Sequence, residues 1–445
     1  MPSERKMAET RRIPSLANVH TTKRTKRERN GVHGWHPYYA GYAERFVSDV
    51  LSLLAEPEDI VLDPWNGSGT TTFVAQRSGF HGIGVEINPV MVIHAQAKNL
   101  EFPLQATQLS RKCSDIIQRA KQKVGIELDP DIEIENWVSG EALESLILLR
   151  DSIFESSPDP IVPDFASEIF VKPSLLRNIS KETAFYLSAL FQVLRAVGNF
   201  SQGSNPTWLK QTSQTDTIFT RENVFLSFQE VVEKMLIDLS AARTLLTSRG
   251  DYWVIEGNSC ELSIESASID LVVTSPPYCT RIDYAFATKP ELALLGYVNS
   301  EFDSLRRQTM GAPVIVNKQL RPNETWGALC NDFLASVAVH PSKASSTYYL
   351  PTFVQYFHDA QQSLEEIYRI LNQRGKAAIV VQSSYYKDIA LPLGDIYVEM
   401  CEQVGFRATI AKRINVRQHM AHVNTKSRRY QQEKVYYEDV VLLEK

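Results

Sequence analysis

A strand, a glycine-rich turn, the start of a helix and a second strand follow one another between residues 59 and 86. Residues 59–62 read as a strand, and residues 83–86 read as a second short strand that ends in an acid. Between the two, Gly67 and Gly69 let the backbone turn tightly and approach a ligand closely. This order predicts a nucleotide-binding βαβ unit.

The glycine turn restricts the class of ligand. Glu86 stands seventeen residues beyond Gly69, where a carboxylate can accept hydrogen bonds from ribose hydroxyls. The dinucleotide fingerprint requires a third glycine, but Thr72 occupies that position, and no lysine follows Gly69 as a phosphate-binding P-loop requires. These residues favour a nucleoside ligand without a pyrophosphate. A glycine turn that binds nothing is the structural alternative.

A second apolar run, residues 269–273, leads into Thr-Ser-Pro-Pro-Tyr at residues 274–278. The run has the length and β-branched content of a buried strand, and two consecutive prolines cannot continue a strand ladder because neither has an N–H. Prolines also restrict the residue before them, so the carbonyls of Ser275 and Pro276 point in set directions. The sequence predicts a strand that delivers a rigid loop with a hydroxyl, carbonyl acceptors and an aromatic ring.

That loop suits the chemistry of an exocyclic amine on a flat heterocycle. The lone pair of such an amine is conjugated into the ring, which makes the nitrogen a poor nucleophile. Hydrogen bonds from its N–H groups to the Ser275 hydroxyl and the Pro276 carbonyl would draw the nitrogen toward tetrahedral geometry and free the lone pair. Tyr278 would stack on the base, a contact worth about 1–3 kcal/mol in single-strand binders. An ordinary proline turn after a core strand is the alternative.

Together these stretches resemble the DNA amino-methyltransferases, which transfer a methyl group from S-adenosylmethionine to N4 of cytosine or N6 of adenine. Residues 63–71 are similar to the cofactor loop of that family, and residues 274–278 to its catalytic loop in the serine form associated with cytosine. The segment Trp-His-Pro-Tyr-Tyr at 35–39 resembles the one under the methionine end of the cofactor. Before the catalytic strand the family has an aspartate facing the cofactor adenine, and this chain has Asn258.

The resemblance implies S-adenosylmethionine as cofactor and no metal. The catalytic residues that it implies are Ser275, Pro276, Pro277 and Tyr278. The cofactor-binding residues that it implies are Tyr38, Asp63, Trp65, Asn66, Gly67, Gly69, Thr70, Glu86, Asn258 and Ser259.

The composition is that of a globular enzyme, since 43% of the 445 residues are apolar, enough for a sizeable core. No stretch approaches 18 apolar residues and the first residues lack an apolar signal core, so a cytoplasmic location is expected. The five cysteines form no paired motif with histidines, as expected of reduced thiols, and no zinc site is expected. Cys279 does not follow a proline, as the nucleophile of cytosine-C5 enzymes does, and is interpreted as a packing residue.

Residues 1–30 contain nine basic and three acidic side chains, a net charge of +6. Because the whole chain carries −5, residues 31–445 carry −11, which opposes polyanion binding unless positive charge gathers on one face. We expect residues 1–30 to form a disordered tail that contacts DNA phosphates without sequence preference.

Three segments complete the expected organisation. Residues 31–105 form the cofactor-binding half of a methyltransferase domain, and residues 248–445 form its catalytic half. Between them, residues 106–247 have helical apolar spacing and read as an insertion suited to base-sequence recognition, with a purely structural cap as the alternative. The exposed candidates for base contacts in the insertion are Thr207, Trp208, Lys210 and Gln211.

Beyond the catalytic loop, residues 281–351 read as an irregular lid or DNA-facing loop. The expected elements after it are a helix at 353–371, a strand at 377–381, a helix at 391–404 capped by Gly405, and strands at 409–416 and 435–443. Alternating strands and helices predict a doubly wound, Rossmann-like α/β sheet with a helical insertion.

The resemblance predicts an enzyme that methylates the exocyclic amine of a flipped base in double-stranded DNA. The expected target is N4 of cytosine. Methylation of adenine N6 and the same chemistry on RNA are the nearest alternatives. A nucleic-acid-binding subunit of a defence complex that has lost turnover is an alternative of another class. A restriction endonuclease or another defence-system component is the expected protein partner, and no membrane is involved.

Overall fold

The computed structural model describes residues 16–25, 28–37, 41–100, 106–126, 129–161, 164–170, 179–202, 209–212, 219–242, 250–279, 282–416 and 434–445. Tyr38, Thr207 and Trp208 lie outside these ranges. No helix among the described residues has the length and apolar content needed to cross a membrane.

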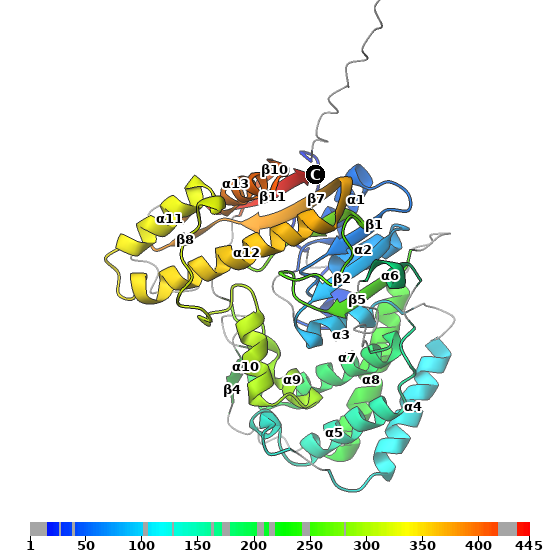
Figure 1. Ribbon diagram of the computed structural model, residues 1–445. Coiled ribbons are helices and arrows are strands. Elements are labelled where there is room, and N and C mark those ends of the chain that lie inside the picture. The colour runs from blue at the N-terminus through cyan, green and yellow to red at the C-terminus, as the bar shows by residue number, and fades with distance from the viewer. Residues whose placement is uncertain are drawn as a thin grey trace, which may run out of the picture.

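A seven-stranded sheet with the strand order β10-β11-β7-β6-β1-β2-β5 forms the centre of the fold (Figure 1). Its strands are β1 (Ile60–Asp63), β2 (His81–Glu86), β5 (Tyr252–Glu256), β6 (Ile269–Thr274), β7 (Leu371–Gln382), β10 (Arg407–Asn415) and β11 (Tyr437–Glu444). Strands β5, β2, β1, β6 and β7 run parallel to one another, and β11 runs antiparallel between β7 and β10. The predicted doubly wound sheet is confirmed.

Helices cover both faces of the sheet, as parallel strands require. Helices α1 (Glu44–Leu54) and α2 (Thr70–Arg77) pack on one face, and α12 (Leu350–Ile370) and α13 (Leu393–Val404) pack on the other. Successive strand residues alternate between the faces: Val61 and Val273 join the first core, whereas Leu62 and Val272 join the second. Because both faces are buried, the strands are continuous apolar runs in the sequence, and those runs are what predicted them.

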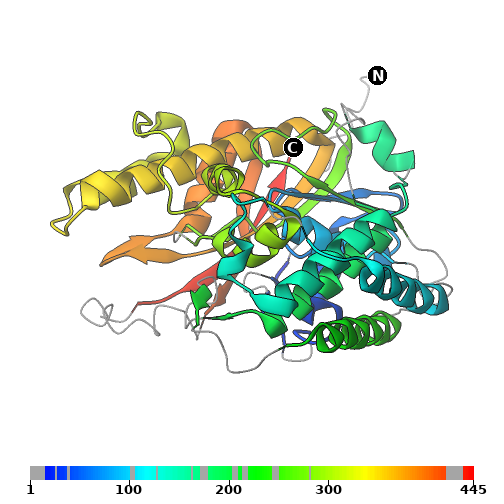
Figure 2. The same cartoon turned by 90° about the horizontal axis from the view of Figure 1, so that it is seen from below.

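A separate helical layer lies beside the sheet and has its own core (Figures 1 and 2). Its helices are α4 (Ala106–Gln122), α5 (Gly140–Glu155), α7 (Lys181–Val197) and α8 (Arg221–Ala241), and it packs against α3 (Pro89–Ala97). The short elements among them are η1 (Gly31–Gly34), η2 (Glu133–Asn136), α6 (Asp164–Ile169), β3 (Phe200–Gln202) and β4 (Leu209–Gln211). Lys210 and Gln211 lie exposed on β4.

The expectation of an irregular segment at 281–351 is wrong. It contains η4 (Phe286–Thr288), α9 (Lys289–Leu295), α10 (Asn299–Gln308), η5 (Glu324–Trp326), α11 (Ala328–Val339) and η6 (Ser345–Tyr349). These helices are short and gain their stability from packing: Leu292 and Phe302 enter the core of the helical layer, and Phe333 enters the core beneath α12. A two-stranded hairpin of β8 (Ser384–Tyr386) and β9 (Ile389–Leu391) follows β7.

The expectation of a disordered tail is also wrong for residues 16–25. Leu16 and Val19 are buried in the core that covers β1 and β6. The Thr22 hydroxyl donates to Glu438, and the Lys412 ammonium donates to the carbonyls of residues 17 and 19. Burial of Leu16 and Val19 and the hydrogen bonds to Glu438 and Lys412 therefore order this segment despite its charged residues. Residues 1–15 lie outside the described part of the chain.

Candidate functional site

A pocket lies at the carboxyl ends of β1, β2, β5 and β6, the edge where open α/β sheets bind ligands. Its empty volume, which includes the space at its open mouth, is about 1160 Å³. Residues from both predicted loops line it: Trp65, Asn66, Gly67 and Thr70 from the first, and Ser275, Pro276, Pro277 and Tyr278 from the second. Glu86, Asn258 and Ser259 also line it. Segments more than 200 residues apart in the sequence thus form one cavity.

Asp63 lies beneath both loops and does not line the pocket. Its carboxylate accepts hydrogen bonds from the Trp65 N–H at 3.1 Å and from the Thr71 hydroxyl at 2.7 Å, both in the first loop. It also accepts from the Thr274 hydroxyl, which directly precedes Ser275. Burial raises the pKa of Asp63, and these donors oppose that shift. The residue aligns the two loops with each other.

Glu86 ends β2 with its carboxylate in the pocket. One oxygen accepts from the Gly67 N–H at 2.8 Å and the other from the Asn88 N–H at 2.9 Å. Each carboxylate oxygen has further acceptor capacity, which two adjacent hydroxyls could use. Burial raises the pKa of Glu86 to about 7, against the lowering effect of the two N–H donors.

Gly69 caps α2 with a φ of +79°, a conformation that favours glycine. A Cβ at this position would lie 2.7 Å from the Cβ of Ala95 on α3. Gly69 is absent from the pocket lining. The structure therefore gives Gly69 a turn and packing role, while Gly67, also at positive φ, faces the pocket.

The serine–proline loop is held from behind. The Ser275 hydroxyl donates to the Val380 carbonyl at 2.9 Å, which directs the hydroxyl proton into the sheet and leaves the oxygen lone pairs for another donor. The Tyr356 hydroxyl on α12 donates to the Pro277 carbonyl at 3.0 Å. Pro276 is buried, whereas Ser275 and Tyr278 are half-buried at the pocket wall. The loop is rigid and presents hydrogen-bond acceptors to the cavity.

Asn258 and Ser259 follow β5 on the same edge. The Asn258 side-chain carbonyl accepts from the Cys260 N–H at 3.0 Å, and the Ser259 hydroxyl contacts the Ser363 hydroxyl at 2.9 Å. Asn258 is thereby fixed in a tight turn beside the pocket. Unlike an aspartate, its amide also offers N–H donors.

The pocket includes residues that the sequence did not single out. Tyr284, Thr288, Gln308, Thr309 and Met310 reach it from the segment after the catalytic loop. Asn88 also lines it, caps α3 through the Val90 N–H and donates to the Thr288 hydroxyl at 2.9 Å. An asparagine before a proline is a helix-start signal that could have identified Asn88. No sequence signal identified the others.

Cys279 is buried in the core beneath α12. Burial raises the pKa of its thiol well above the ordinary value. A thiol in that state is a poor nucleophile. The position agrees with the interpretation of Cys279 as a packing residue.

Residues 4–97 match the family model N6_N4_Mtase, described as DNA methylase. The chain is 23% identical over 304 residues to the Type II methyltransferase M.BsoBI of Geobacillus stearothermophilus, across 65% of this chain and 58% of the relative. It is 20% identical over 392 residues to the Type II methyltransferase M.AvaI of Anabaena variabilis, across 82% of this chain and 78% of the relative.

Among solved structures, the rRNA methyltransferase aviRa from Streptomyces viridochromogenes matches over 96% of both chains at 11% identity with a TM-score of 0.31. A TM-score of that size carries no argument about fold or function. The family relationship rests on the sequence matches, which agree with the resemblance carried by the two loops. The chain is thus similar to DNA methylases, over residues 4–97 and over the stretches matched by the two relatives.

Proposed function

We propose that this protein methylates the exocyclic amine of a base flipped out of double-stranded DNA. One observation carries the proposal: a single pocket joins the glycine loop and Glu86 to the loop of Ser275 and Tyr278. The family relationship implies S-adenosylmethionine as the methyl donor.

The residues of the pocket fit that donor. The Glu86 carboxylate retains acceptor capacity for the ribose hydroxyls, and Ile87 and Met91 supply apolar contacts beside it. Asn66 also lines the pocket, and its side-chain carbonyl accepts from the Thr72 hydroxyl at 3.2 Å. When bound, the donor supplies an electrophilic methyl group on sulfonium sulfur.

The side chains of the catalytic loop would activate the acceptor. The Ser275 oxygen and the Pro276 carbonyl accept hydrogen bonds from the amine, and Tyr278 stacks on the base. The amine lone pair would then be available to take the methyl group, the donor would leave as a neutral thioether, and the proton lost from the nitrogen would pass to solvent. Catalysis comes mainly from alignment of the two reactants.

Cytosine N4 is the target that we propose, because serine heads the loop. The nucleosides of DNA from cells that express the protein should contain N4-methylcytosine, while DNA from cells that express Ser275→Ala should not. Mass spectrometry of digested DNA and RNA measures this. N6-methyladenine instead would reverse the choice of base, and methylation confined to RNA would reverse the choice of nucleic acid. An absence of methylation despite cofactor binding would favour an inactive binding subunit.

Glu86 predicts a pH dependence of cofactor affinity. The ionised carboxylate accepts hydrogen bonds from ribose hydroxyls more strongly and at more sites than the protonated acid, so affinity should rise as pH increases through about 7. In the cofactor-free protein the sign is opposite: the raised pKa contributes stability that is present below 4.5 and lost as pH rises through about 7. Calorimetry from pH 6 to 8 tests the first statement. Glu86→Gln should bind more weakly with a flat pH profile, and an equally steep profile in that variant would contradict the assignment.

Both curated relatives are named Type II methyltransferases. We therefore propose a restriction endonuclease or another defence-system component as the protein partner.

A further inference from the structure

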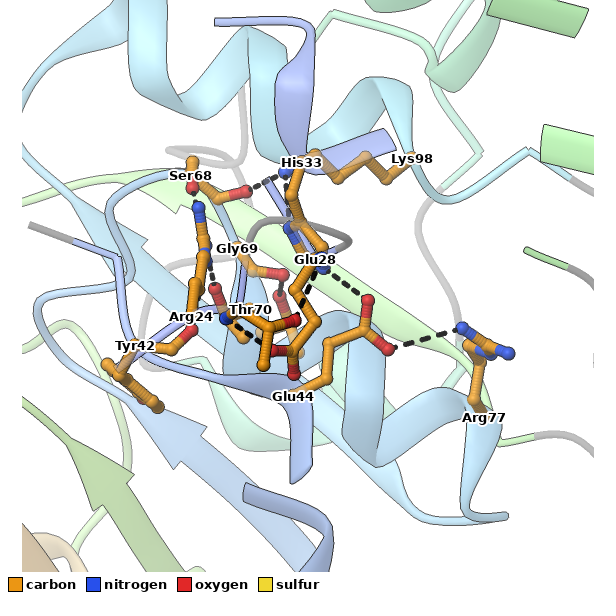
Figure 3. Close-up of polar contacts among 12 residues, drawn as sticks. Arg24, Glu28, His33, Tyr42, Glu44, Ser68, Gly69, Thr70, Arg77 and Lys98 are labelled. Atoms are coloured by element: carbon orange, nitrogen blue, oxygen red, sulfur yellow. Dashed lines mark hydrogen bonds and ion pairs between the residues drawn. The ribbon is translucent and has the colours of Figure 1, made fainter. Parts of the chain in front are cut away.

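A buried arginine from the N-terminal segment contacts the glycine loop from behind. Arg24 is 8% exposed. Its Nε donates to the Tyr42 carbonyl at 3.0 Å, and one terminal nitrogen donates to the Thr70 hydroxyl at 2.6 Å and to the Ser68 hydroxyl at 3.5 Å (Figure 3). Ser68, Thr70 and Tyr42 all line the pocket. The guanidinium thus lies directly behind the pocket wall.

Lys98 contacts the same loop from α3. It is 3% exposed, and its Nζ donates to the Ser68 carbonyl at 2.5 Å (Figure 3). The same nitrogen lies 3.4 Å from Nδ1 of His33, whose Nε2 lies 2.8 Å from a carboxylate oxygen of Glu44. Burial lowers the pKa of His33 to about 3, so the ring is neutral and links Lys98 to Glu44.

The guanidinium of Arg24 packs against Gly41. A Cβ at Gly41 would lie 2.4 Å from the guanidinium carbon, so glycine is needed where the side chain passes. Burying a basic side chain is costly unless its hydrogen bonds are made. Here the bonds go to the Tyr42 carbonyl, to Thr70 at the start of α2 and to Ser68 in the loop Asn66–Gly69, which has no regular secondary structure of its own. These three hydrogen bonds of Arg24 therefore hold the pocket wall in place and make no contact at the protein surface.

We propose that Arg24 is a positioning residue for the cofactor loop, and that docking of residues 16–25 is coupled to cofactor binding. The proposal rests on the proposed function, because it takes S-adenosylmethionine to be the ligand of the pocket. Leu16, Val19 and Thr22 dock the segment on the sheet, and Arg24 connects it to Ser68 and Thr70. Coupling is reciprocal, so the cofactor must also hold the segment in place.

This role differs from a grip on DNA phosphates. A phosphate contact requires an accessible side chain and lowers the salt dependence of DNA affinity when it is lost. Arg24 is buried, whereas Arg29, five residues further along the chain, is exposed. The two arginines therefore form a matched pair with the same charge and opposite surroundings.

The variants Arg24→Ala, Arg24→Lys and Arg29→Ala of the full chain test the proposal with S-adenosylmethionine in calorimetry. Arg24→Ala should raise the cofactor Kd at least 10-fold. Arg24→Lys should recover part of the loss, since an ammonium cannot reach both the Tyr42 carbonyl and the Thr70 hydroxyl. Arg29→Ala should leave Kd unchanged. In turnover, Arg24→Ala should raise the KM for cofactor and keep kcat near the parent value, a split that general destabilisation does not produce.

Hydrogen exchange of the parent protein provides a second measurement if Arg24→Ala does not fold. Saturating S-adenosylmethionine should slow exchange of the backbone amides of residues 16–25. Equal cofactor Kd values for Arg24→Ala and the parent would overturn the proposal. So would hydrogen-exchange rates in residues 16–25 that are the same with and without the cofactor. A reduced salt slope of DNA affinity with unchanged cofactor Kd would overturn it in favour of a phosphate contact. A parent protein that binds no S-adenosylmethionine would instead overturn the proposed function.

Discussion

Replacement of Ser275 by alanine should lower kcat about 100-fold, the size of effect seen when one preorganised hydrogen bond at a reacting centre is removed. The serine hydroxyl proton is directed to the Val380 carbonyl at 2.9 Å, so its oxygen faces the pocket as an acceptor. Alanine keeps the loop geometry, since the prolines remain, and removes only that acceptor. The loss should appear in the chemical step and not in cofactor affinity.

Single-turnover kinetics with a fluorescent base analogue at the target would separate the steps. Ser275→Ala should flip the base as the parent does and transfer the methyl group slowly, whereas Tyr278→Ala should also weaken the hold on the flipped base. Ser268→Ala, at the approach to the same strand and outside the pocket lining, is the matched control. Full activity in Ser275→Ala would refute the proposed activation of the amine.

Replacement of Gly69 by alanine should destabilise the fold far more than the same change at Gly125. Both glycines have φ near +79°, so both pay about 1–2 kcal/mol for a Cβ in the left-handed region. Only at Gly69 does the new Cβ meet another atom, the Ala95 Cβ at 2.7 Å, whereas nothing lies within 4 Å at Gly125. Overpacking of a core adds about 1–3 kcal/mol.

Urea unfolding of the two variants measures the difference in the free energy of unfolding. Gly125→Ala reports the backbone cost alone, so the excess for Gly69→Ala isolates the contact between α2 and α3. Equal losses would mean that α3 moves away at little cost. Any effect of Gly69→Ala on cofactor affinity should scale with the fraction folded, because this glycine is absent from the pocket lining.

Local patterns sufficed where an element is determined by its own residues. Strand β6 was predicted because its apolar run ends at two prolines, and β1 because an apolar run precedes a glycine turn. The glycine cap of α13 was predicted from Gly405, whose φ is +116°. Helices α9, α10 and α11 were missed because each is short and owes its burial to residues distant in sequence. Charge composition misled at residues 16–25, since it cannot show that Arg24 finds Thr70 forty-six residues away.

The candidate site likewise contains residues that local sequence predicts and residues that depend on the tertiary structure. Its two loops were identified because each carries its chemistry in consecutive residues, and the pocket joins them. Asp63 and Gly69 belong to the first loop but support it from behind, a distinction that depends on which way a side chain faces. Tyr284 and Gln308 could not be predicted because their approach depends on how the chain returns after the catalytic loop.

The carboxylate of Asp63 spans the boundary between adjacent strands β1 and β6, and this has a consequence for how such a chain can diversify. The Asp63 side chain aligns the loop after β1 with the loop after β6. The helical layer comes elsewhere in the sequence, between β2 and β5. Changes within residues 106–247 that keep the faces packed on α3 and α9 would therefore leave the alignment of the two loops in place.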